Sequence, residues 1–387
     1  MTQQLKQDCE TMKEGNRLLV FNLIRTHSGL SRAELAKITR MSSTSIGRIV
    51  NGLMEDNLVM ETGTGQNKLG RKATSLDVNP GGRFALGIDL DVYEACIGLV
   101  NLGGTLLHSR VMVFENGNYN EDRLQQIAAE AENFLDGFSS DIKENIIGIG
   151  LTVPGHILWN SGELILSPQL NLHNIRLKAL FQSHFAYPVY VDNDVKSQAL
   201  AERLWGMARH EPDFLMISMG NGLGISFFQN GRLLRGRDNI AGELGHIVVK
   251  PGGYLCDCGK RGCLQTYLCL SAIEKRLKKP LAEILSEAEN GDAKALALID
   301  EILEMGSVWT ANLINIYNPP LIIFSGKVMK IWPDFPQQMN QLYGQYVWSH
   351  LKNSIKIVSA DESPLPSNAR PVLSAAAIVF YQYFLPQ

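Results

Sequence analysis

The sequence predicts an α/β protein with a small helical module at its N-terminus and a larger body of alternating strands and helices. Between residues 16 and 55, apolar residues recur at the spacing of amphipathic helices. From residue 84 onward, apolar runs of strand length alternate with amphipathic segments, which is typical of an α/β fold. A histidine and three cysteines in the second half have the spacing of a structural metal site.

Length and composition indicate a soluble globular protein of two or three domains. The chain has 387 residues, of which 45% are hydrophobic and 19% are charged, and its net charge is −3. We find no apolar run of membrane-spanning length and no signal-peptide pattern, so we expect a cytoplasmic protein without membrane insertion. Residues 17–72 carry nine Lys or Arg against four Asp or Glu, so this segment can approach phosphates while the acidic remainder cannot.

Residues 16–55 have the pattern of a helix-turn-helix. Residues 16–27 form an apolar stripe, and Ser31-Arg32-Ala33-Glu34 is a capping box that opens a second helix. Ser42 or Ser43 caps a third helix. The outer N-terminal face of this third helix presents short hydrogen-bonding groups and one guanidinium, which suit phosphates and base edges in a major groove. These residues are Ser43, Thr44, Ser45 and Arg48.

A basic hairpin follows the three helices. Two strand-like runs, 58–62 and 74–78, flank a glycine-rich tip that carries Lys68, Arg71 and Lys72. The alternative is a small helical interaction domain, because helix-turn-helix patterns also arise by chance. The complete order favours a winged helix-turn-helix whose wing contacts the minor groove or the backbone. Since one such module covers only a few base pairs, we expect a homodimer on paired half-sites.

The body divides into two comparable halves. Apolar runs predict strands over residues 84–89, 95–101, 106–114, 146–153, 189–191 and 214–219. Amphipathic patterns predict helices over residues 122–138 and 199–205. In the second half, Gly224 and Asn230-Gly231 indicate hairpin turns.

His246, Cys256, Cys258 and Cys263 follow the spacing H-x9-C-x-C-x4-C. One imidazole and three thiolates form a closed tetrahedral set for Zn²⁺, and a closed set predicts a structural rather than a catalytic zinc. The other three cysteines are scattered through a long chain without a secretory signal, so we expect ordinary thiols rather than a disulfide framework.

The body resembles the ROK family of repressors and sugar kinases, and the whole chain is similar to its NagC/XylR-type repressors over about residues 14–384. The resemblance is carried by Thr152-Val153-Pro154-Gly155, Asn193-Asp194, Glu243-Leu244-Gly245-His246 and the three cysteines at 256, 258 and 263. It implies a winged helix-turn-helix followed by a two-lobed actin-like ATPase fold. The expected domains are a DNA-binding domain at 1–80, a first lobe at 81–198 with 370–387, and a second lobe with the zinc site at 199–369.

The resemblance also implies a sugar site. In the kinases, the residue matching Asp194 is the general base that deprotonates a sugar hydroxyl, and the family pattern makes its neighbours hydroxyl contacts. Carboxylates, amides and a zinc-held imidazole offer the donors and acceptors that vicinal hydroxyls need. Without the family pattern, Asp194 would also fit a helix N-cap and Glu243 a solvated turn. The expected sugar-binding residues are Gly155, Asn171, Asn193, Asp194, Glu243, His246 and Gln265.

Departures from the kinase pattern favour a repressor without kinase activity. After the first strand the kinases carry D-x-G-G/x-T, where this chain has Asp89-Leu90-Asp91-Val92-Tyr93. Asp91 and Tyr93 place a carboxylate and a ring where the phosphate loop needs a glycine and a small hydroxyl residue. A later glycine loop at 220–224 is largely retained, but the loop at 324–327 has a single glycine where a pair is expected. Gln265 stands where sugar-binding members have a glutamate.

The sequence therefore predicts a sugar-responsive repressor of carbohydrate metabolism genes. Its expected partners are operator DNA, a sugar or sugar phosphate effector, and further copies of the chain in a dimer or tetramer. An active sugar kinase that also binds DNA and a repressor released by a protein partner are the alternatives. We expect the effector to touch both lobes, with Asn193 and Asp194 from the first and Glu243 and His246 from the second. Effector binding would then lower operator affinity, although the opposite sign, a corepressor, stays open.

Overall fold

The computed structural model describes residues 2–64, 74–115 and 117–384. Contacts along the backbone group the chain into two compact units. The first unit contains Met1–Val153, Ile175–Asp192 and Pro371–Gln387, and the second contains Pro154–Asn174 and Asn193–Arg370. This grouping does not separate residues 1–80 from the rest of the first unit, so the three domain boundaries expected from the sequence remain predictions.

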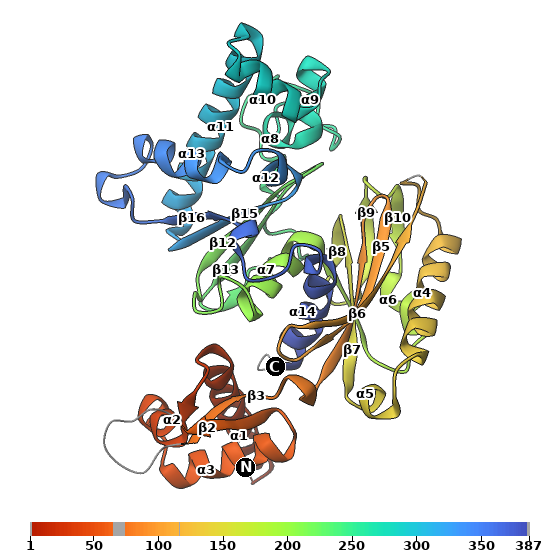
Figure 1. Ribbon diagram of the computed structural model, residues 1–387, viewed down its shortest axis with the longest axis vertical. Helices are drawn as coiled ribbons and strands as arrows, with labels where there is room; N and C mark the ends of the chain where they lie inside the picture. The colour runs from red at the N-terminus through yellow and green to blue at the C-terminus, as the bar shows by residue number, and fades with distance from the viewer. Residues whose placement is uncertain (1, 65–73, 116, 385–387) are drawn as a thin grey trace. The chain divides into compact units, whose positions relative to one another are not determined.

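The N-terminal module consists of three helices and a small antiparallel sheet (Figure 1). Its elements are α1 (Thr2–Thr26), β1 (Leu30–Ser31), α2 (Arg32–Thr39), α3 (Ser43–Glu55), β2 (Val59–Thr64) and β3 (Thr74–Val78), and the strand order is β1-β3-β2. The predicted helices and hairpin are confirmed. The first helix is longer than residues 16–27, because an apolar stripe marks only the part of a helix that packs against a core.

Local capping fixes the boundaries of the helix-turn-helix. Ser31 caps α2, and its side chain and that of Glu34 form the reciprocal bonds of the predicted capping box. Arg40 ends α2 in the left-handed region at φ 58°. Ser42, rather than Ser43, caps α3, since its hydroxyl accepts the backbone N–H of Ser45. Three short signals in the sequence thus set the turn between α2 and α3.

A five-stranded sheet with the order β11-β7-β4-β5-β6 follows. Its strands are β4 (Phe84–Leu90), β5 (Glu94–Asn101), β6 (Leu106–Val113), β7 (Ile146–Val153) and β11 (Val189–Asn193). The first three pair as an antiparallel meander, and β4 pairs with β7 in parallel. The predicted strands are confirmed within a few residues at each end.

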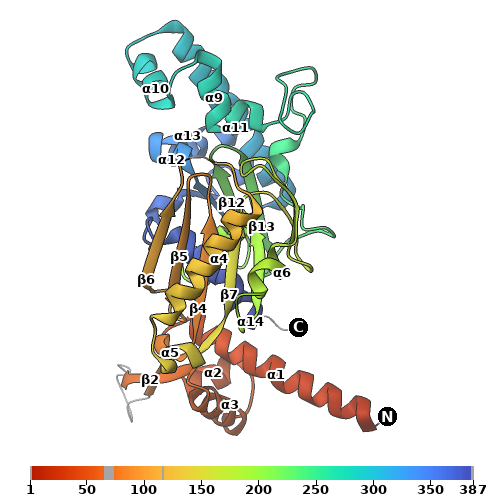
Figure 2. The ribbon, with the colours of Figure 1, turned by 90° about the vertical axis from the view of Figure 1, so that its right-hand side faces the viewer.

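Helices lie on both faces of this sheet. On one face lie α4 (Glu121–Asp136) and α6 (Leu177–Gln182), and on the other lies the C-terminal helix α14 (Arg370–Phe384) (Figures 1 and 2). The short α5 (Ser140–Glu144) precedes β7. The helix α14 approaches the strands closely: a Cβ added at Gly150 would lie 1.9 Å from the carbonyl oxygen of Ala375. Glycine at this position therefore permits the sheet and α14 to pack at backbone distance.

The second unit contains a sheet built on the same plan. Its order is β14-β13-β12-β15-β16, with strands β12 (Phe214–Met219), β13 (Leu223–Gln229), β14 (Arg232–Leu233), β15 (Leu321–Ser325) and β16 (Lys356–Ser359). As in the first sheet, three strands form an antiparallel meander, here β12-β13-β14. Its first strand, β12, also pairs in parallel with β15. The two comparable halves inferred from the sequence are thus two sheets of matching topology.

The remaining elements of the second unit supply its core and its loops. Its helices are α7 (Asp194–Leu204), α8 (Gln265–Leu268), α9 (Leu270–Leu277), α10 (Leu281–Glu289), α11 (Ala293–Tyr317), α12 (Lys327–Ile331) and α13 (Phe335–Leu342). A separate sheet of order β10-β9-β8 contains β8 (His156–Leu158), β9 (Glu163–Ser167) and β10 (Leu172–Ile175). Apolar residues of β12, β13 and α8 to α13 form one continuous core. Within the described part of the chain, no helix has the length and hydrophobicity needed to cross a membrane.

One hairpin prediction was wrong. Gly224 lies inside β13, and the turn between β12 and β13 is instead closed by a hydrogen bond from the N–H of Gly220 to the carbonyl of Gly222. Gly224 is small because α7 packs there: a Cβ at this position would lie 2.6 Å from Cγ2 of Val195. The Asn230-Gly231 turn is confirmed, with both residues at positive φ between β13 and β14.

Candidate functional site

The predicted metal ligands come together in space. The ligand atoms of His246, Cys256, Cys258 and Cys263 all lie within 4.8 Å of one another. The Nδ1 atom of His246 is 3.6 Å from Sγ of Cys256, and the sulfurs of Cys258 and Cys263 are also 3.6 Å apart. His246 belongs to a short 3-10 turn (Leu244–His246), and the cysteines lie in the loop that leads into α8.

The two 3.6 Å separations fit the edges of a tetrahedral metal site. With Zn–S bonds of about 2.3 Å and Zn–N bonds of about 2.1 Å, the edges of a tetrahedron are roughly 3.6–3.8 Å. Burial raises the pKa of Cys263 to about 12, and the neighbouring thiols add to the shift. The pKa of Cys256 is also raised by burial, whereas hydrogen bonds that outweigh burial lower the pKa of Cys258. A divalent cation is the natural partner that favours the thiolate form of all three. The group can hold a metal ion and is compatible with zinc.

Asn193 organises the junction between β11 and α7. Its side-chain oxygen accepts the backbone N–H groups of Val195 and Lys196 at 3.0 and 3.2 Å, which caps α7. Its amide nitrogen donates to the carbonyl of Gly155 at 3.1 Å. The helix therefore starts at Asp194, five residues before the position expected from the sequence, and the cap is Asn193 rather than Asp194.

The start of β13 brings the two halves of the predicted sugar set close together. Val195, next to Asp194, packs on Gly224, while a Cβ added at Gly245, next to His246, would lie 2.4 Å from the carbonyl oxygen of Leu223. Consecutive residues of β13 thus contact the neighbours of Asp194 and of His246. Glu243 is exposed and immediately precedes the turn that carries His246.

Gln265, which the sequence predicts as a sugar contact, lies beside the metal cluster, a position that the sequence did not predict. Its amide nitrogen lies 3.5 Å from Sγ of Cys256, so the side chain contacts the metal cluster. Gln169 was missed altogether: its amide nitrogen would be 3.3 Å from a Cβ at Gly222. Asn171, which was predicted instead, is exposed and adopts a positive φ of 55°. A polar residue two positions earlier in the same loop gave no separate signal.

The predicted sugar residues all fall in one unit. Gly155, Asn193 and Asp194 belong to the second unit together with Glu243 and His246, because the boundary lies between Asp192 and Asn193. The expectation that Asn193 and Asp194 come from the other lobe therefore differs from the observed grouping. The chain leaves the first sheet at the end of β11, and the backbone from Asn193 onward packs with the second sheet.

The first phosphate-type loop forms a closed turn between β4 and β5. The N–H of Asp91 donates to the carbonyl of Glu94 at 2.9 Å, and the carboxylate of Asp91 accepts the N–H of Val92 at 2.7 Å. Tyr119 donates its hydroxyl to the carbonyl of Asp91 at 2.8 Å. The ring of Tyr93 is 58% exposed. The N–H groups of Asp91 and Val92 are thus already bonded within the turn.

In the N-terminal module, Ser43, Thr44 and Arg48 are exposed on α3, as predicted. Ser45 is half-buried, and its hydroxyl lies 2.9 Å from that of Ser42, so it takes part in the cap. The predicted wing residues Lys68, Arg71 and Lys72 lie outside the described residues.

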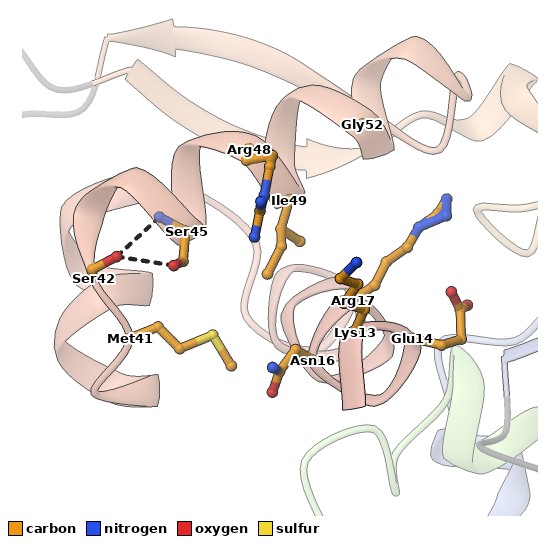
Figure 3. A pocket seen from close by; sticks show the side chains of 10 residues that line it. All are labelled: Lys13, Glu14, Asn16, Arg17, Met41, Ser42, Ser45, Arg48, Ile49 and Gly52. Carbon is orange, nitrogen blue, oxygen red and sulfur yellow. Dashed lines mark hydrogen bonds between the residues drawn. The ribbon is translucent and has the colours of Figure 1, made fainter. Parts of the chain in front are cut away.

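A groove of about 470 Å³ runs between α1 and α3. Arg48 extends from α3 over this groove, and the opposite wall comes from α1 (Figure 3). That wall contains Lys13 and Asn16, which the sequence did not mark, and Arg17, whose guanidinium pairs with Asp56 at 2.5 Å. Only the packing of α1 against α3 places these side chains beside the predicted recognition helix.

Comparisons with known proteins agree with the fold and with both parts of the chain. The sequence profile of the ROK family matches residues 85–380. A xylose repressor of Caldicellulosiruptor bescii is 29% identical over 86% of this chain and 88% of its own. A solved ROK family transcriptional regulator, described as a homologue of the Escherichia coli MLC protein, superposes with a TM-score of 0.80 at 26% identity over 97% of each chain. A ROK hexokinase of Thermus thermophilus, 23% identical, shares the fold with a TM-score of 0.64 over 78% of this chain and 99% of its own.

Proposed function

The chain belongs to the ROK family, and on that premise we propose that it is a sugar-responsive transcriptional repressor that does not phosphorylate its effector. DNA binding is assigned to residues 1–80, and effector binding to the polar residues around the start of β13. The His246 and cysteine cluster holds a structural zinc ion. The protein acts in the cytoplasm as a homodimer or tetramer on genes of carbohydrate metabolism. Its similarity to a xylose repressor makes a pentose the first effector to test.

The turn between β4 and β5 is the observation that carries this proposal. An ATP-binding loop must aim free backbone N–H groups at phosphate oxygens. Here the N–H groups of Asp91 and Val92 bond to a carbonyl and a carboxylate of the same turn. The carboxylate of Asp91 also repels a triphosphate. A body that retains sugar-type residues but lacks this loop favours binding without phosphoryl transfer.

The effector residues have complementary chemistry. Asp194 and Glu243 are acceptors for hydroxyl groups, and Asn193 fixes Gly155 beside them. Because Nδ1 of His246 faces the cysteines, the other ring nitrogen lies on the opposite edge, where it can bond to a hydroxyl. The zinc ion would fix the loop that carries this imidazole. The set suits a neutral polyol such as an aldose, oriented by directional hydrogen bonds.

The N-terminal module suits sequence-specific DNA. Thr44 and Arg48 are four residues apart on α3, so they share one face of the helix. A guanidinium in this position can bond to a guanine edge, and the wing cations Lys68, Arg71 and Lys72 contact the backbone. Two modules, about 34 Å apart in a dimer, would cover adjacent major grooves. Effector binding in the body then changes operator affinity by changing how two modules are presented.

A two-step experiment tests the effector site. A thermal-shift screen of free, amino and phosphorylated sugars first finds an effector, since a ligand of the native state raises the melting temperature. Operator affinity is then measured with and without that sugar for the wild type, Asp194→Ala, Glu243→Ala and the exposed-carboxylate control Glu289→Ala. We expect about a ten-fold or larger weakening of DNA binding in the wild type and the control, and none in the two site variants. Unchanged operator affinity at saturating sugar would refute the proposal.

The retained Asp194 favours one alternative, an active sugar kinase that also binds DNA. A coupled ATP-consumption assay with the same sugars distinguishes the two functions. The repressor proposal expects background rates, whereas turnover that disappears in Asp194→Asn would establish a kinase. A repressor released by a protein partner would show operator binding that responds to none of the sugars.

A further inference from the structure

Gln265 is held at a fixed point between the metal cluster and the predicted effector residues. It opens α8 directly after Cys263 and Leu264. Leu264 is completely buried, and its N–H donates to the carbonyl of Ile247 at 2.9 Å. The backbone carbonyl of Gln265 accepts the N–H of Cys269 at 3.1 Å. Because the core and these bonds fix the backbone, the side chain of Gln265 has a defined origin and reach.

The amide nitrogen of Gln265 points at a metal ligand. It lies 3.5 Å from Sγ of Cys256, the same sulfur that is 3.6 Å from Nδ1 of His246. A thiolate sulfur only accepts hydrogen bonds, so the NH₂ end of the amide must be the end that faces it. An N–H donor to a metal-bound thiolate stabilises its charge and orients the ligand, as outer partners of metal ligands generally do. A glutamate side chain, ionised at neutral pH, could not make this bond.

The amide oxygen of Gln265 faces two glycines. It would be 3.3 Å from a Cβ at Gly245 and 4.0 Å from a Cβ at Gly222. The amide nitrogen of Gln169 approaches that same position on Gly222 to 3.3 Å. The amide oxygen of Gln265, an acceptor, and the amide nitrogen of Gln169, a donor, thus both lie beside Gly222, which has no side chain. A hydroxyl group can donate to the first and accept from the second, and Gly245 is adjacent to His246.

On the basis of the proposed function, we propose that Gln265 is a positioning residue that couples the effector to the metal loop. Its N–H holds the Cys256 thiolate, and its carbonyl oxygen accepts a hydroxyl of the sugar, with Gln169 donating to that same hydroxyl. Binding at the oxygen polarises the amide and strengthens the N–H bond to sulfur, because linked hydrogen bonds reinforce one another. The thiolate loop thereby senses an occupied site through a single side chain.

Cobalt substitution provides a readout at the sulfur that needs neither DNA nor enzymatic activity. In the Co²⁺-loaded protein, the sulfur-to-cobalt charge-transfer band reports the electron density on the thiolates. Removal of the N–H donor in Gln265→Glu or Gln265→Leu should shift this band to lower energy and weaken metal affinity by about ten-fold or more. Gln229→Ala, at an exposed amide of β13, is the matched control, and its band should stay at the wild-type position. Spectra and affinities of both Gln265 variants equal to the wild type would overturn the proposal.

A second measurement, with D-xylose, D-glucose and N-acetyl-D-glucosamine, distinguishes the role of the amide oxygen of Gln265 from that of its amide nitrogen. Gln265→Glu keeps an acceptor oxygen and should still bind the sugar that stabilises the wild type, whereas Gln265→Leu should lose that binding. The same sugar should shift the cobalt band of the wild type and leave that of Gln265→Glu unchanged. A sugar that binds the wild type without moving its band would refute the coupling. If no sugar binds at all, the effector assignment fails, and the sugar-free spectra still decide the bond to Cys256.

Discussion

At the scale of single residues, Asp91 shows how one side chain can occupy a backbone amide of a turn. Its carboxylate bonds to the N–H of the next residue, and its own N–H is used by Glu94. A glycine there would free the N–H of Val92 for an anion, because it lacks the competing acceptor, while its own N–H would keep the bond to the carbonyl of Glu94. The negative charge of Asp91 adds repulsion toward an anion. The sequence already indicated the charge, while the structure adds the hydrogen bonds that occupy the loop.

The metal cluster leads to a prediction at the same scale. Cys258→Ser should lose bound zinc, because a hydroxyl is a poor replacement for a thiolate ligand, and the loop between β14 and α8 should become less stable. Metal content by elemental analysis and the melting temperature measure both effects. Cys96→Ala is the control. This buried thiol lies in β5 of the first sheet and is not part of the cluster, so the zinc content should stay at one per chain. Wild-type protein prepared without chelators that contains no zinc would contradict the assignment.

Glu34 predicts a dependence of stability on pH. Its carboxylate accepts the hydroxyl and the N–H of Ser31 at 2.7 and 2.8 Å, and these bonds lower the pKa of Glu34. A lowered folded-state pKa means that the stabilisation is complete above the unfolded value of about 4.3 and is lost as the pH falls through the folded value. The difference in unfolding free energy between wild type and Glu34→Gln should therefore be constant above about pH 5 and shrink below about pH 4.

Ser31→Ala is the second variant for this measurement, because it removes the hydroxyl whose hydrogen bond lowers the pKa of Glu34. In that background the pH dependence caused by Glu34 should become smaller. Urea unfolding at a series of pH values measures both differences. A pH profile of Glu34→Gln that stays parallel to the wild type down to pH 3 would show that the capping box does not perturb this carboxylate.

At the scale of elements, local caps set the ends of the helices in the helix-turn-helix, whereas the groove beside α3 depends on packing between helices that are distant in the chain. Ser31, Ser42 and Arg40 set where α2 and α3 end and begin, and each acts within four residues of its partner. The groove beside α3 exists only because α1 packs on it and brings Lys13 near Arg48. Local signals therefore give the motif, whereas its cationic surface also includes residues from a separate helix.

Arg48 on α3 and Arg71 in the predicted wing should affect DNA binding in different ways. Arg48→Ala should weaken binding to the operator by about 1–3 kcal/mol and relax the preference for one base pair, because Arg48 is proposed to make a bidentate contact to guanine. Arg71→Ala should weaken binding to all sequences alike and make the salt dependence shallower. Fluorescence anisotropy with operator and scrambled duplexes at several salt concentrations measures both, and Lys294→Ala on α11 is the control.

The wing assignment depends on the second of these results. Arg71 lies outside the described residues, so the prediction comes from the sequence alone. If Arg71→Ala changed the affinity for no duplex at low salt, the basic hairpin would not contact DNA. If Arg48→Ala reduced binding to operator and scrambled duplexes equally, Arg48 would contact the backbone rather than a base.

At the scale of the whole molecule, α14 joins elements from both ends of the chain. Its residues pack against the first sheet at Gly87 and Gly150, where glycine permits backbone contact. Its last described residue, Phe384, stacks on Phe21 of α1 with ring centroids 4.2 Å apart. Both rings are buried. The N-terminal module is therefore connected to the first sheet by side-chain packing as well as by the chain itself.

Removal of this contact should be costly. Phe384→Ala should destabilise the protein by about 3 kcal/mol, because truncation of a buried aromatic ring loses its contacts and leaves a cavity. Tyr383→Ala is the matched control, since the neighbouring ring is 45% exposed and its loss should cost about 1 kcal/mol or less. Chemical denaturation followed by far-ultraviolet circular dichroism measures both. Equal losses for the two variants would show that the stack with Phe21 does not contribute.

The sequence by itself determined the order of the elements in the N-terminal module and the first sheet, the residues of the metal cluster and the family. Apolar periodicity located the strands of the first sheet and β12 of the second within a few residues, because a half-buried strand or helix imposes its own repeat on the chain. It did not locate β13, β15 and β16. The cap of α2 was evident for the same reason, since it forms within four residues. The identities of His246 and the three cysteines sufficed for the cluster, because few other residue sets have that spacing.

Only the tertiary structure decided what depends on contacts between distant segments. The bond from Gln265 to Cys256, the approach of Gln169 to Gly222 and the packing of Phe21 on Phe384 leave no periodic signal in the sequence. The same holds for Lys13 beside α3, because its neighbour in space is more than 30 positions away in the chain. Spacing identifies groups that act through local geometry, whereas side chains that meet by packing become visible only when the fold brings them together.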